Sequence, residues 1–566
     1  MSSAGFCERR WGMPGEAVRA AGCRCGGVVS RIPAFLLCVA ALALFVALPY
    51  RSLDSDVTTF GIMGNDLLRL GYLPSLTYGQ NYLFSFTPYS YALLRWVFPG
   101  LDPGLALVLG GAVFSITGLW LLAESLLVLL RGRGERPLLP LGLFCLAIAS
   151  SSLYLFDIET CSSIEMSLFL LGLVFYAAAR LEAGATRNPA AALTSWWLLL
   201  GLATSATLYT RPQIALYGIP LMVAFLARVR RLHGGRVAKR RGVLLAAGAL
   251  AGYLPMLAHH VFRAADWPFR NHLHPKLALL KTGDTAARFF KEVGARIFGV
   301  CADHPVFSAI SLAWVALAIL AFALAWRRNR SQPGFVSALD AAWLIGSLGI
   351  VLTMILVPAF VMDGESRRYC LHVLPATAWL FARFVPLAGG GWSRWAAAMF
   401  AMALAAASVP VWTSRIDSET LRNEGIRDIR DRFLPELMES QAVIITDYWD
   451  AYLLAFLADG KIKIEAFPWH SVRTYGLVGR DEMRRRTLWL VRTGFRQSTE
   501  EKLVKELGPG VLDRVTAQDM REPLLGHACQ LWNLGDPESA VALMQKFRKQ
   551  YFARPYPPGS GGGEVP

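Results

Sequence analysis

Two carboxylates open the stretch of this chain whose residue types are best suited to chemistry. Asp54 and Asp56 are two residues apart and directly follow the first membrane-length apolar segment, residues 32–50. A carboxylate held at a membrane surface can act as a general base, because it accepts the proton of an attacking hydroxyl group. In an extended segment the two side chains would project on the same side, whereas in a helix they would diverge. The same acids also fit an ordinary loop outside the membrane, so spacing alone leaves both interpretations open.

The residues behind these acids predict an amphipathic helix. Over residues 60–70, apolar side chains recur at mostly helical spacing around a few polar ones. This pattern is typical of a helix that lies on the membrane interface, with its apolar face among the lipid headgroups. Gly71, Pro74 and Gly79 then indicate a loop,.

Three more acids fall in the second loop expected outside the membrane: Asp157, Glu159 and Glu165. Burying charge in lipid is costly, so ionisable residues at the ends of membrane spans are candidates for catalysis or acceptor binding. The alternative is that these acids face solvent in an ordinary loop.

Arginines on the same side of the membrane predict a phosphate site. Arg211 lies in the short turn 210–213, which keeps it near the membrane surface, and Arg367 and Arg368 precede Tyr369 at the start of a late span. Guanidinium groups bind phosphate oxygens through paired hydrogen bonds. Arg367 and Arg368 also run against the usual positive-inside bias, which favours a functional role over boundary marking by snorkelling.

A long loop outside the membrane, residues 263–305, carries further cations. Lys276 and Lys281 would add positive charge to the phosphate site if the loop acts as a lid, which is the role we expect. His272 and His274 lie nearby, but no i, i+4 histidine pair with a carboxylate typical of zinc sites is present,. We therefore assign no metal site and no cofactor, and a divalent metal requirement stays open.

Composition places the chain among multispanning membrane proteins. Of its 566 residues 54% are hydrophobic, the mean hydropathy is +0.39, and the formal net charge is +16. Long uncharged runs at this hydropathy are typical of membrane spans. The basic residues cluster at the ends of these runs, which indicates orienting charge and excludes a nucleic-acid-binding surface. The absence of a nucleotide-binding glycine loop or Walker motif argues against a nucleotide-sugar donor or an ATP-driven pump.

The alternation of basic loops predicts the topology. The Arg-rich tail of residues 1–31 would be cytoplasmic, and residues 32–412 would form about eleven transmembrane helices with an outer catalytic loop at residues 51–104. Residues 413–554 would then be an extracytoplasmic α/β domain, and residues 555–566 a disordered Pro/Gly-rich tail,. Short strands are expected at residues 442–446, 461–467 and 488–491, with a helix at residues 453–457.

Several motifs together resemble the bacterial polytopic glycosyltransferases of the GT-C type, which include the protein O-mannosyltransferases and the lipid A aminoarabinose transferases. Many members read Asp-Ser-Asp-Glu, a Gly-Leu-Met helix, a Gly-x-x-Pro turn, Tyr-Gly-Gln, a Glu before a returning span, Arg-Tyr-Leu and Asp-Tyr-Trp. The corresponding residues here are Asp54-Ser55-Asp56-Val57, Gly61-Ile62-Met63, Gly71-Tyr72-Leu73-Pro74, Tyr78-Gly79-Gln80, Glu165, Arg368-Tyr369-Cys370 and Asp447-Tyr448-Trp449. The family Glu is Val57 in this chain, so any function of that Glu is lost or supplied from elsewhere.

The resemblance implies an inverting transferase of the inner (plasma) membrane. It would move a sugar from a polyprenyl-phosphate-linked donor to a lipid, glycan or protein acceptor, through a hydroxyl or amine. Asp56 would be the general base, with Asp54 as the second candidate, and Tyr78 and Gln80 would belong to the site loop. The rival interpretations are a lipid or polysaccharide transporter or flippase, whose outer charges would line a pathway, and a GT-C protein that has lost catalysis.

Overall fold

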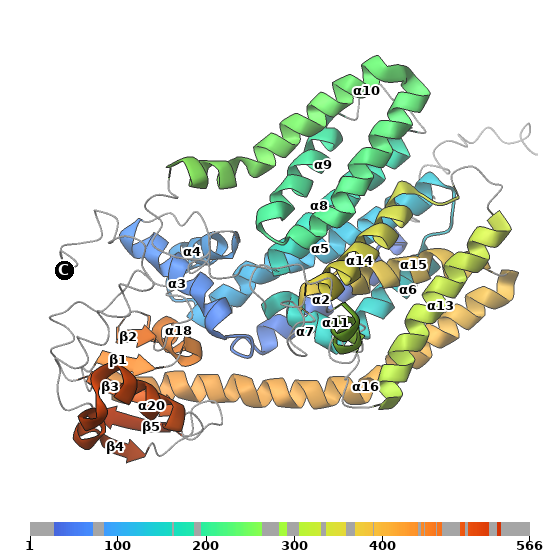
Figure 1. The fold of residues 1–566 in the computed structure, drawn as a ribbon. Helices are drawn as coiled ribbons and strands as arrows, with labels where there is room; N and C mark the ends of the chain where they lie inside the picture. Colours follow the sequence, from blue (N-terminus) through green and yellow to red (C-terminus); the bar gives the residue numbers. More distant parts are fainter. Residues whose placement is uncertain are drawn as a thin grey trace, which may run out of the picture.

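The structure is a computed structural model that describes most of the apolar helices and parts of the C-terminal sheet (Figure 1). The described residues are 28–71, 84–160, 164–185, 194–262, 282–290, 305–329, 335–357, 368–388, 390–439, 443–446, 448–459, 461–466, 487–492, 496–519 and 529–533.

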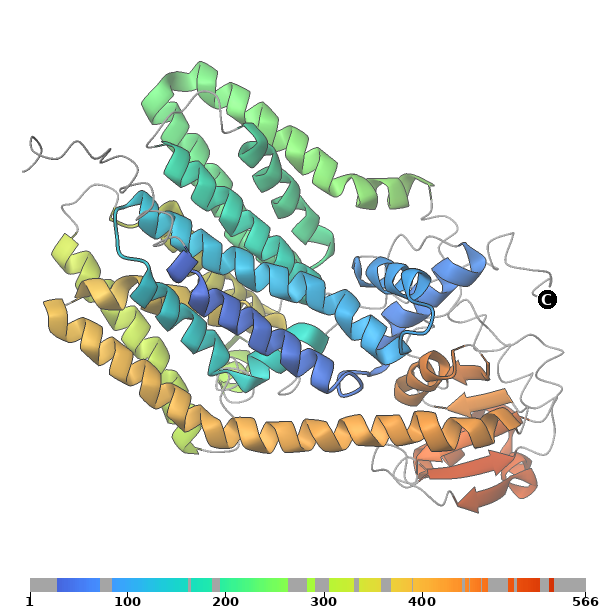
Figure 2. The ribbon, with the colours of Figure 1, turned by 180° about the vertical axis from the view of Figure 1, so that it is seen from behind.

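Helices make up the larger part of the molecule and run side by side in a bundle (Figure 2). In chain order they are α2 (Ile32–Ala47), α3 (Ser55–Leu70), α4 (Thr87–Val97), α5 (Pro103–Gly132), α6 (Leu138–Ala149), α7 (Ser152–Thr160), α8 (Ile164–Ala185), α9 (Thr194–Ala206), η1 (Thr207–Tyr209), η2 (Pro212–Ile214), α10 (Ala215–Phe262), α11 (Thr282–Arg288), α13 (Pro305–Asn329), α14 (Ala338–Leu356), α15 (Val373–Ala388) and α16 (Gly390–Asp428).

Every segment predicted to span the membrane falls wholly or partly on one of these helices. The segments 214–227 and 242–262 are joined in α10, which turns sharply at Gly234, where φ is 83°. Among the described residues, five helices are long and apolar enough to cross a membrane: Pro103–Gly132, Ile164–Gly184, Pro212–Phe262, Ala338–Leu356 and Arg394–Phe433. Because α2, α6 and α15 are apolar but shorter, the number of eleven spans stays a prediction.

The centre of the bundle is the packing of α5 against α8. A Cβ atom on Gly118 of α5 would lie 2.7 Å from the carbonyl oxygen of Leu168, and one on Gly172 of α8 would lie 2.8 Å from the oxygen of Gly118. Small residues at both positions therefore allow the two backbones to approach closely, as is common between membrane helices.

A five-stranded sheet follows the bundle, with strand order β2-β1-β3-β5-β4. Its strands are β1 (Val443–Thr446), β2 (Lys463–Ala466), β3 (Thr487–Arg492), β4 (Thr516–Asp519) and β5 (Cys529–Asn533), and the helical elements are η7 (Ile429–Phe433), α17 (Leu434–Glu439), α18 (Tyr448–Leu457), α20 (Arg496–Leu507) and η9 (Pro509–Arg514). Strand β1 is parallel to β2 and β3, whereas β5 is antiparallel to β3 and β4. The first three strands and α18 lie at the segments predicted to form strands and a helix.

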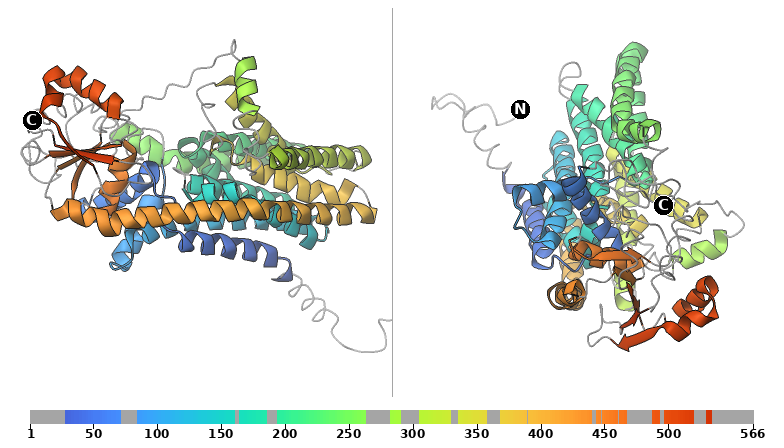
Figure 3. Two further views of the ribbon diagram at one scale, coloured as in Figure 1. Left: turned by 90° about the horizontal axis from the view of Figure 1, so that it is seen from below. Right: turned by 90° about the vertical axis from the view of Figure 1, so that its left-hand side faces the viewer.

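One helix connects the bundle to this sheet. The apolar segment 395–412 and a charged helical segment at residues 415–438 were expected on either side of a boundary. The first segment and the second as far as Asp428 belong to α16, a helix of 39 residues. Figure 3 shows α16 running along the bundle and reaching the sheet at one end.

Helix α3 lies where the spacing of apolar residues predicted a helix, but its surroundings differ from the membrane interface that we expected. We expected its apolar face to lie among lipid headgroups, and this is wrong for most of the face: Phe60 and Met63 are 2% and 1% exposed and pack inside the protein. A Cβ on Gly61 would lie 2.1 Å from the ring of Phe456 on α18, and one on Gly64 would lie 2.3 Å from Tyr91 on α4. Periodicity identifies an apolar face but not what covers it, and here two other helices cover it.

Candidate active site

The two candidate carboxylates lie at the N-terminus of α3. Asp54 is the N-cap, with extended backbone angles, and its Oδ1 accepts a hydrogen bond of 2.8 Å from the backbone N–H of Val57. Asp56 lies in the first turn, where a negative charge is favourable next to the free N–H groups of the helix,. Asp54 is therefore engaged in the cap, whereas Asp56 lies one position inside the helix end, close enough for the two carboxylates to influence each other.

Burial is the main influence on the pKa of Asp54. It raises the pKa of the carboxyl group to about 6, and the neighbouring Asp56 carboxylate acts in the same direction. The hydrogen bond from Val57 and the charges of Arg422 and Arg368 act in the opposite direction. The negative charges of two neighbouring, partly buried carboxylates are therefore offset by the positive charges of arginines from α16 and from the turn before α15.

The turn before α15 brings the guanidinium of Arg368 to Asp56. Nη1 of Arg368 lies 3.9 Å from Oδ2 of Asp56, and the two side chains are 36% and 14% exposed. The guanidinium of Arg368 is also 5.4 Å from the centre of the Tyr369 ring, and that of Arg211 is 5.8 Å from the same centre. Two of the predicted phosphate-binding arginines thus lie at one tyrosine ring, and one of them, Arg368, is also paired with the predicted base.

Arg211 is held by the tight turn in which the sequence places it. It is the N-cap of η2, directly after η1, and only 7% exposed. The backbone N–H of Phe84 donates a 2.9 Å hydrogen bond to the carbonyl of Tyr209, which attaches the end of the first loop to this turn. Aromatic contacts of Phe84 with Tyr209 strengthen the same junction.

Glu165 is completely enclosed rather than exposed to an acceptor. It lies in the first turn of α8, 2% exposed, and its Oε1 accepts hydrogen bonds from Ser85 Oγ at 2.9 Å and Thr87 Oγ1 at 2.8 Å. The charge of Arg211 is close enough to act on it. Of the other two acids in this loop, Asp157 is buried on α7 and Glu159 belongs to the same helix.

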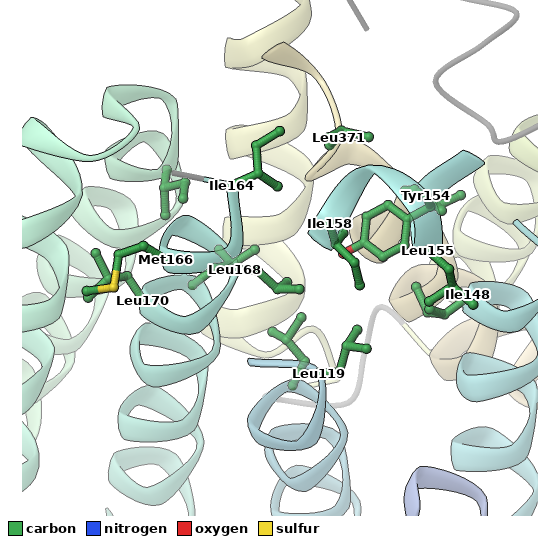
Figure 4. Close-up of a cluster of buried hydrophobic side chains, with 14 of the residues drawn as sticks. Leu119, Ile148, Tyr154, Leu155, Ile158, Ile164, Met166, Leu168, Leu170 and Leu371 are labelled. Carbon is green, nitrogen blue, oxygen red and sulfur yellow. The ribbon is translucent and has the colours of Figure 1, made fainter. Parts of the chain in front are cut away.

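An apolar cluster beneath these loops fixes their relative positions (Figure 4). Leu371 follows the arginine turn, Ile164 precedes Glu165, and Ile158 flanks Asp157; all three apolar residues are at most 3% exposed and belong to one core. Because the arginine turn and the second loop share this support, their positions relative to each other are fixed.

The remaining predicted site residues lie outside the described part of the chain: Tyr78, Gln80, Lys276, Lys281 and Arg367. The same holds for His272 and His274. Within the described ranges, no group of three or more His, Cys, Asp or Glu side chains is arranged to hold a metal ion.

Sequence reasoning missed the residues that support the site. Ser85 and Thr87 hold Glu165 from about 80 residues earlier in the chain, and nothing in their local sequence indicates this. His372 is buried, with Nε2 at 3.0 Å from Ser167 Oγ, and it follows Arg368 closely enough for the arginine motif to have drawn attention to it. Tyr369 is part of that motif, but its place between two guanidiniums is a tertiary feature.

No protein-family model matches the sequence, and no curated protein matches it in sequence. In structure the chain is similar to ArnT from Cupriavidus metallidurans bound to undecaprenyl phosphate, with a TM-score of 0.52 and 14% identity over 88% of this chain and 97% of that one. The apo state of the same enzyme gives a TM-score of 0.52 and 13% identity, over 89% and 98%. The oligosaccharyltransferase AglB from Archaeoglobus fulgidus, in complex with an inhibitory peptide and a dolichol-phosphate, is less similar, with a TM-score of 0.44 and 11% identity over 88% and 74%.

The fold is that of the GT-C type of membrane glycosyltransferase. The similarity to ArnT covers most of this chain and nearly all of that one.

Proposed function

We propose that this chain is a membrane glycosyltransferase that moves a sugar from a polyprenyl-phosphate-linked donor to a hydroxyl or amine acceptor. The observation that carries the proposal is the chain of contacts from Asp56 to Arg368 and from Arg368, through the Tyr369 ring, to Arg211. The similarity to ArnT, which has been solved with undecaprenyl phosphate, supports a lipid-phosphate donor.

Asp56 is the proposed general base. Its side chain is 14% exposed, so its carboxylate is accessible yet partly shielded from water. The acceptor proton moves to Asp56 while the acceptor oxygen or nitrogen forms a bond to the anomeric carbon. The bond between that carbon and the phosphate oxygen breaks, and its electron pair leaves with the polyprenyl phosphate. A single displacement of this kind inverts the anomeric configuration, and a positioned base typically contributes about 10²–10⁴-fold.

The arginines are proposed to stabilise the leaving phosphate. Arg368 lies within 4 Å of the base, so a phosphate bound by it would place the donor next to the acceptor. Arg211 approaches the same tyrosine from a buried turn, where its charge is screened less than at the surface,. Guanidiniums fixed where negative charge develops lower the barrier without a proton donor.

The other predicted site residues have supporting roles in this proposal. Asp54 orients the start of α3, Glu165 supports the Arg211 turn, and Lys276, Lys281 and Arg367 add cations from the outer loops. The N-terminus is cytoplasmic, and residues 413–554 lie outside the membrane with the catalytic loop 51–104, as the charge alternation predicts.

The test measures binding and transfer separately. Undecaprenyl phosphate is titrated onto the purified protein and onto Arg211→Gln, Arg368→Gln and the exposed control Arg427→Gln, with native mass spectrometry as the readout. Loss of one charge-assisted pair costs about 1.5–3 kcal/mol, so each site variant should bind roughly ten- to a hundred-fold more weakly while the control binds normally. Release of undecaprenyl phosphate from a panel of labelled pentose- and hexose-linked donors then reports transfer.

Two results would contradict the proposal. Unchanged lipid affinity in both site variants would leave Arg211 and Arg368 as boundary residues. Tight binding of the lipid with no release from any donor and acceptor would favour the transporter or the inactive GT-C protein.

A further inference from the structure

A polar cavity lies at the opposite end of the bundle from Asp56. It has a volume of about 780 Å³ and is formed by the ends of α5, α8, α13 and α15, the start of α14, and the part of α10 that precedes its turn at Gly234. Glu182 on its wall is 17 residues after Glu165 on α8, which is about 26 Å along the helix,. This distance is close to the thickness of a bilayer core, so the cavity faces the headgroup layer on the other side of the membrane. Figure 2 shows that this end of the bundle is remote from the sheet.

Arginines dominate the polar lining of this cavity. Four guanidiniums, those of Arg133, Arg228, Arg231 and Arg383, face two carboxylates, Glu135 and Glu182. Asp340 lies behind Arg383, at 3.9 Å, but its oxygens are used in the capping box of α14 and by the Trp379 indole N–H. Positive charge therefore exceeds negative charge even when all three carboxylates are counted.

The ion pairs among the described residues do not use up this excess. Glu182 Oε1 serves two cations at once, Arg133 at 3.3 Å and Arg228 at 3.7 Å, while Arg383 is paired with Glu135 at 2.8 Å. Nε of the 1%-exposed Arg383 makes no hydrogen bond within the described part of the chain. Arg231 also lines the cavity and is exposed. The cavity therefore presents an excess of positive charge to which an anion could bind.

We propose that this cavity binds a phosphate group on the side of the membrane opposite Asp56. Arginine clusters at one end of a helix bundle bind lipid phosphates in membrane proteins, and guanidiniums fit phosphate oxygens through paired hydrogen bonds. Apolar lining residues such as Leu129, Phe335 and Leu387 give room for the glycerol part of a phospholipid next to that phosphate. The ligand is a phosphate monoester or diester, supplied either by a lipid headgroup or by a soluble phosphate. This site is distinct from the one in the proposed function, and its test does not depend on transfer.

The experiment compares variants that remove the same charge in different places. Arg228→Gln with Arg231→Gln removes two cavity arginines, whereas Arg236→Gln with Arg240→Gln removes two exposed arginines further along α10. Ala224→Phe keeps every charge and fills part of the cavity. The probes are short-chain phosphatidylglycerol, short-chain phosphatidylcholine, glycerol 3-phosphate and inorganic phosphate, with binding followed by native mass spectrometry and by thermal shift.

We expect phosphatidylglycerol to bind the unaltered protein and to bind the cavity double variant at least about ten-fold more weakly, with normal binding to the control. The Ala224→Phe variant should weaken binding although its charge is unchanged. Binding of the lipid alone identifies a headgroup, and equal dependence for glycerol 3-phosphate or inorganic phosphate identifies a soluble source. Equal losses in the cavity and control double variants, unaltered binding in Ala224→Phe, or no binding of any phosphate probe would each overturn the proposal.

Discussion

Replacing Asp56 by asparagine keeps the shape of the side chain and removes the atom that would accept the proton. The stability of the protein should change little, because the substitution weakens one ion pair of 3.9 Å with the 36%-exposed Arg368. Partly exposed pairs of this kind contribute about 0–1 kcal/mol. Transfer should fall by two or more orders of magnitude, which is the usual contribution of a positioned base.

The structure supplies a matched control two residues away. Asparagine is as good an N-cap as aspartate, so Asp54→Asn keeps the hydrogen bond from Val57 and the start of α3,. It should lower transfer much less than Asp56→Asn does. Asp54→Ala removes the cap and should destabilise the protein by about 1 kcal/mol, again without the full loss of transfer.

The assay is single-turnover release of undecaprenyl phosphate from a labelled donor, together with lipid binding and thermal unfolding of each variant. Lipid binding should survive in all three variants, since none removes an arginine. Near-full transfer by Asp56→Asn together with loss in Asp54→Asn would show that the two roles are exchanged. If both asparagine variants transfer normally, this loop supplies no base and the mechanism is refuted.

Three further predictions concern stability and topology. Gly61→Ala should lower Tm, because overpacking against the Phe456 ring of α18 costs about 1–3 kcal/mol,. The control Gly425→Ala on α16 has open space and should raise Tm, because alanine favours a helix by about 1 kcal/mol over glycine,. Equal changes in Tm for the two variants would contradict the close packing of α3 on α18. The pKa of Asp54 is raised to about 6 from 3.8, so between these values the folded state holds a proton that the unfolded state releases. The free energy of unfolding, relative to that of Asp54→Asn, should therefore fall as pH rises from about 4 to about 6 and stay level above that. A difference in unfolding free energy that does not depend on pH would contradict the burial of Asp54. Reporter fusions at Arg236 and Gly460 should report opposite sides of the membrane, and the same side for both would separate Asp56 from the outer face.

Part of the site follows from local sequence. The position of α3 was predictable because its apolar residues recur at helical spacing and Asp54 is a strong N-cap residue,. The closeness of Asp56 and Arg368 was expected only from the side of the membrane each was assigned to and from the family resemblance. Their 312-residue separation in sequence is bridged by packing that no local pattern records.

The structure shows what the valine at position 57 does where the family has a glutamate. It is the N3 residue of α3, where a glutamate would bond back to the N-cap backbone as in a capping box,. Here the Val57 side chain is buried, 7% exposed, and only its backbone N–H takes part in the cap. The substitution is therefore compatible with a formed helix start, because Asp54 supplies the cap alone.

Other features could not be predicted because they depend on distant partners. Strand β4 has the polar sequence Thr516–Asp519 and no alternation of its own, and it exists as a strand because it pairs with β5,. The apolar segment 138–155 reads as one span, yet α6 ends at Ala149 and α7 begins at Ser152. Two serines at this break bond to the backbone instead of continuing the helix,.

The continuity of α16 and the contact of α18 with α3 close a ring in the molecule. The chain leaves the bundle through a helix of about 58 Å and forms β1. It then contacts the helix that carries Asp56 through Phe456 and Asp459, before it adds the other four strands of the sheet,. A truncation at residue 440 would therefore keep the helices of the bundle and both arginines around Tyr369, yet remove α18 from its contact with α3. Because α18 packs on the helix that carries Asp56, hybrids that join this sheet to other bundles must exchange α3 and α18 together to keep that contact.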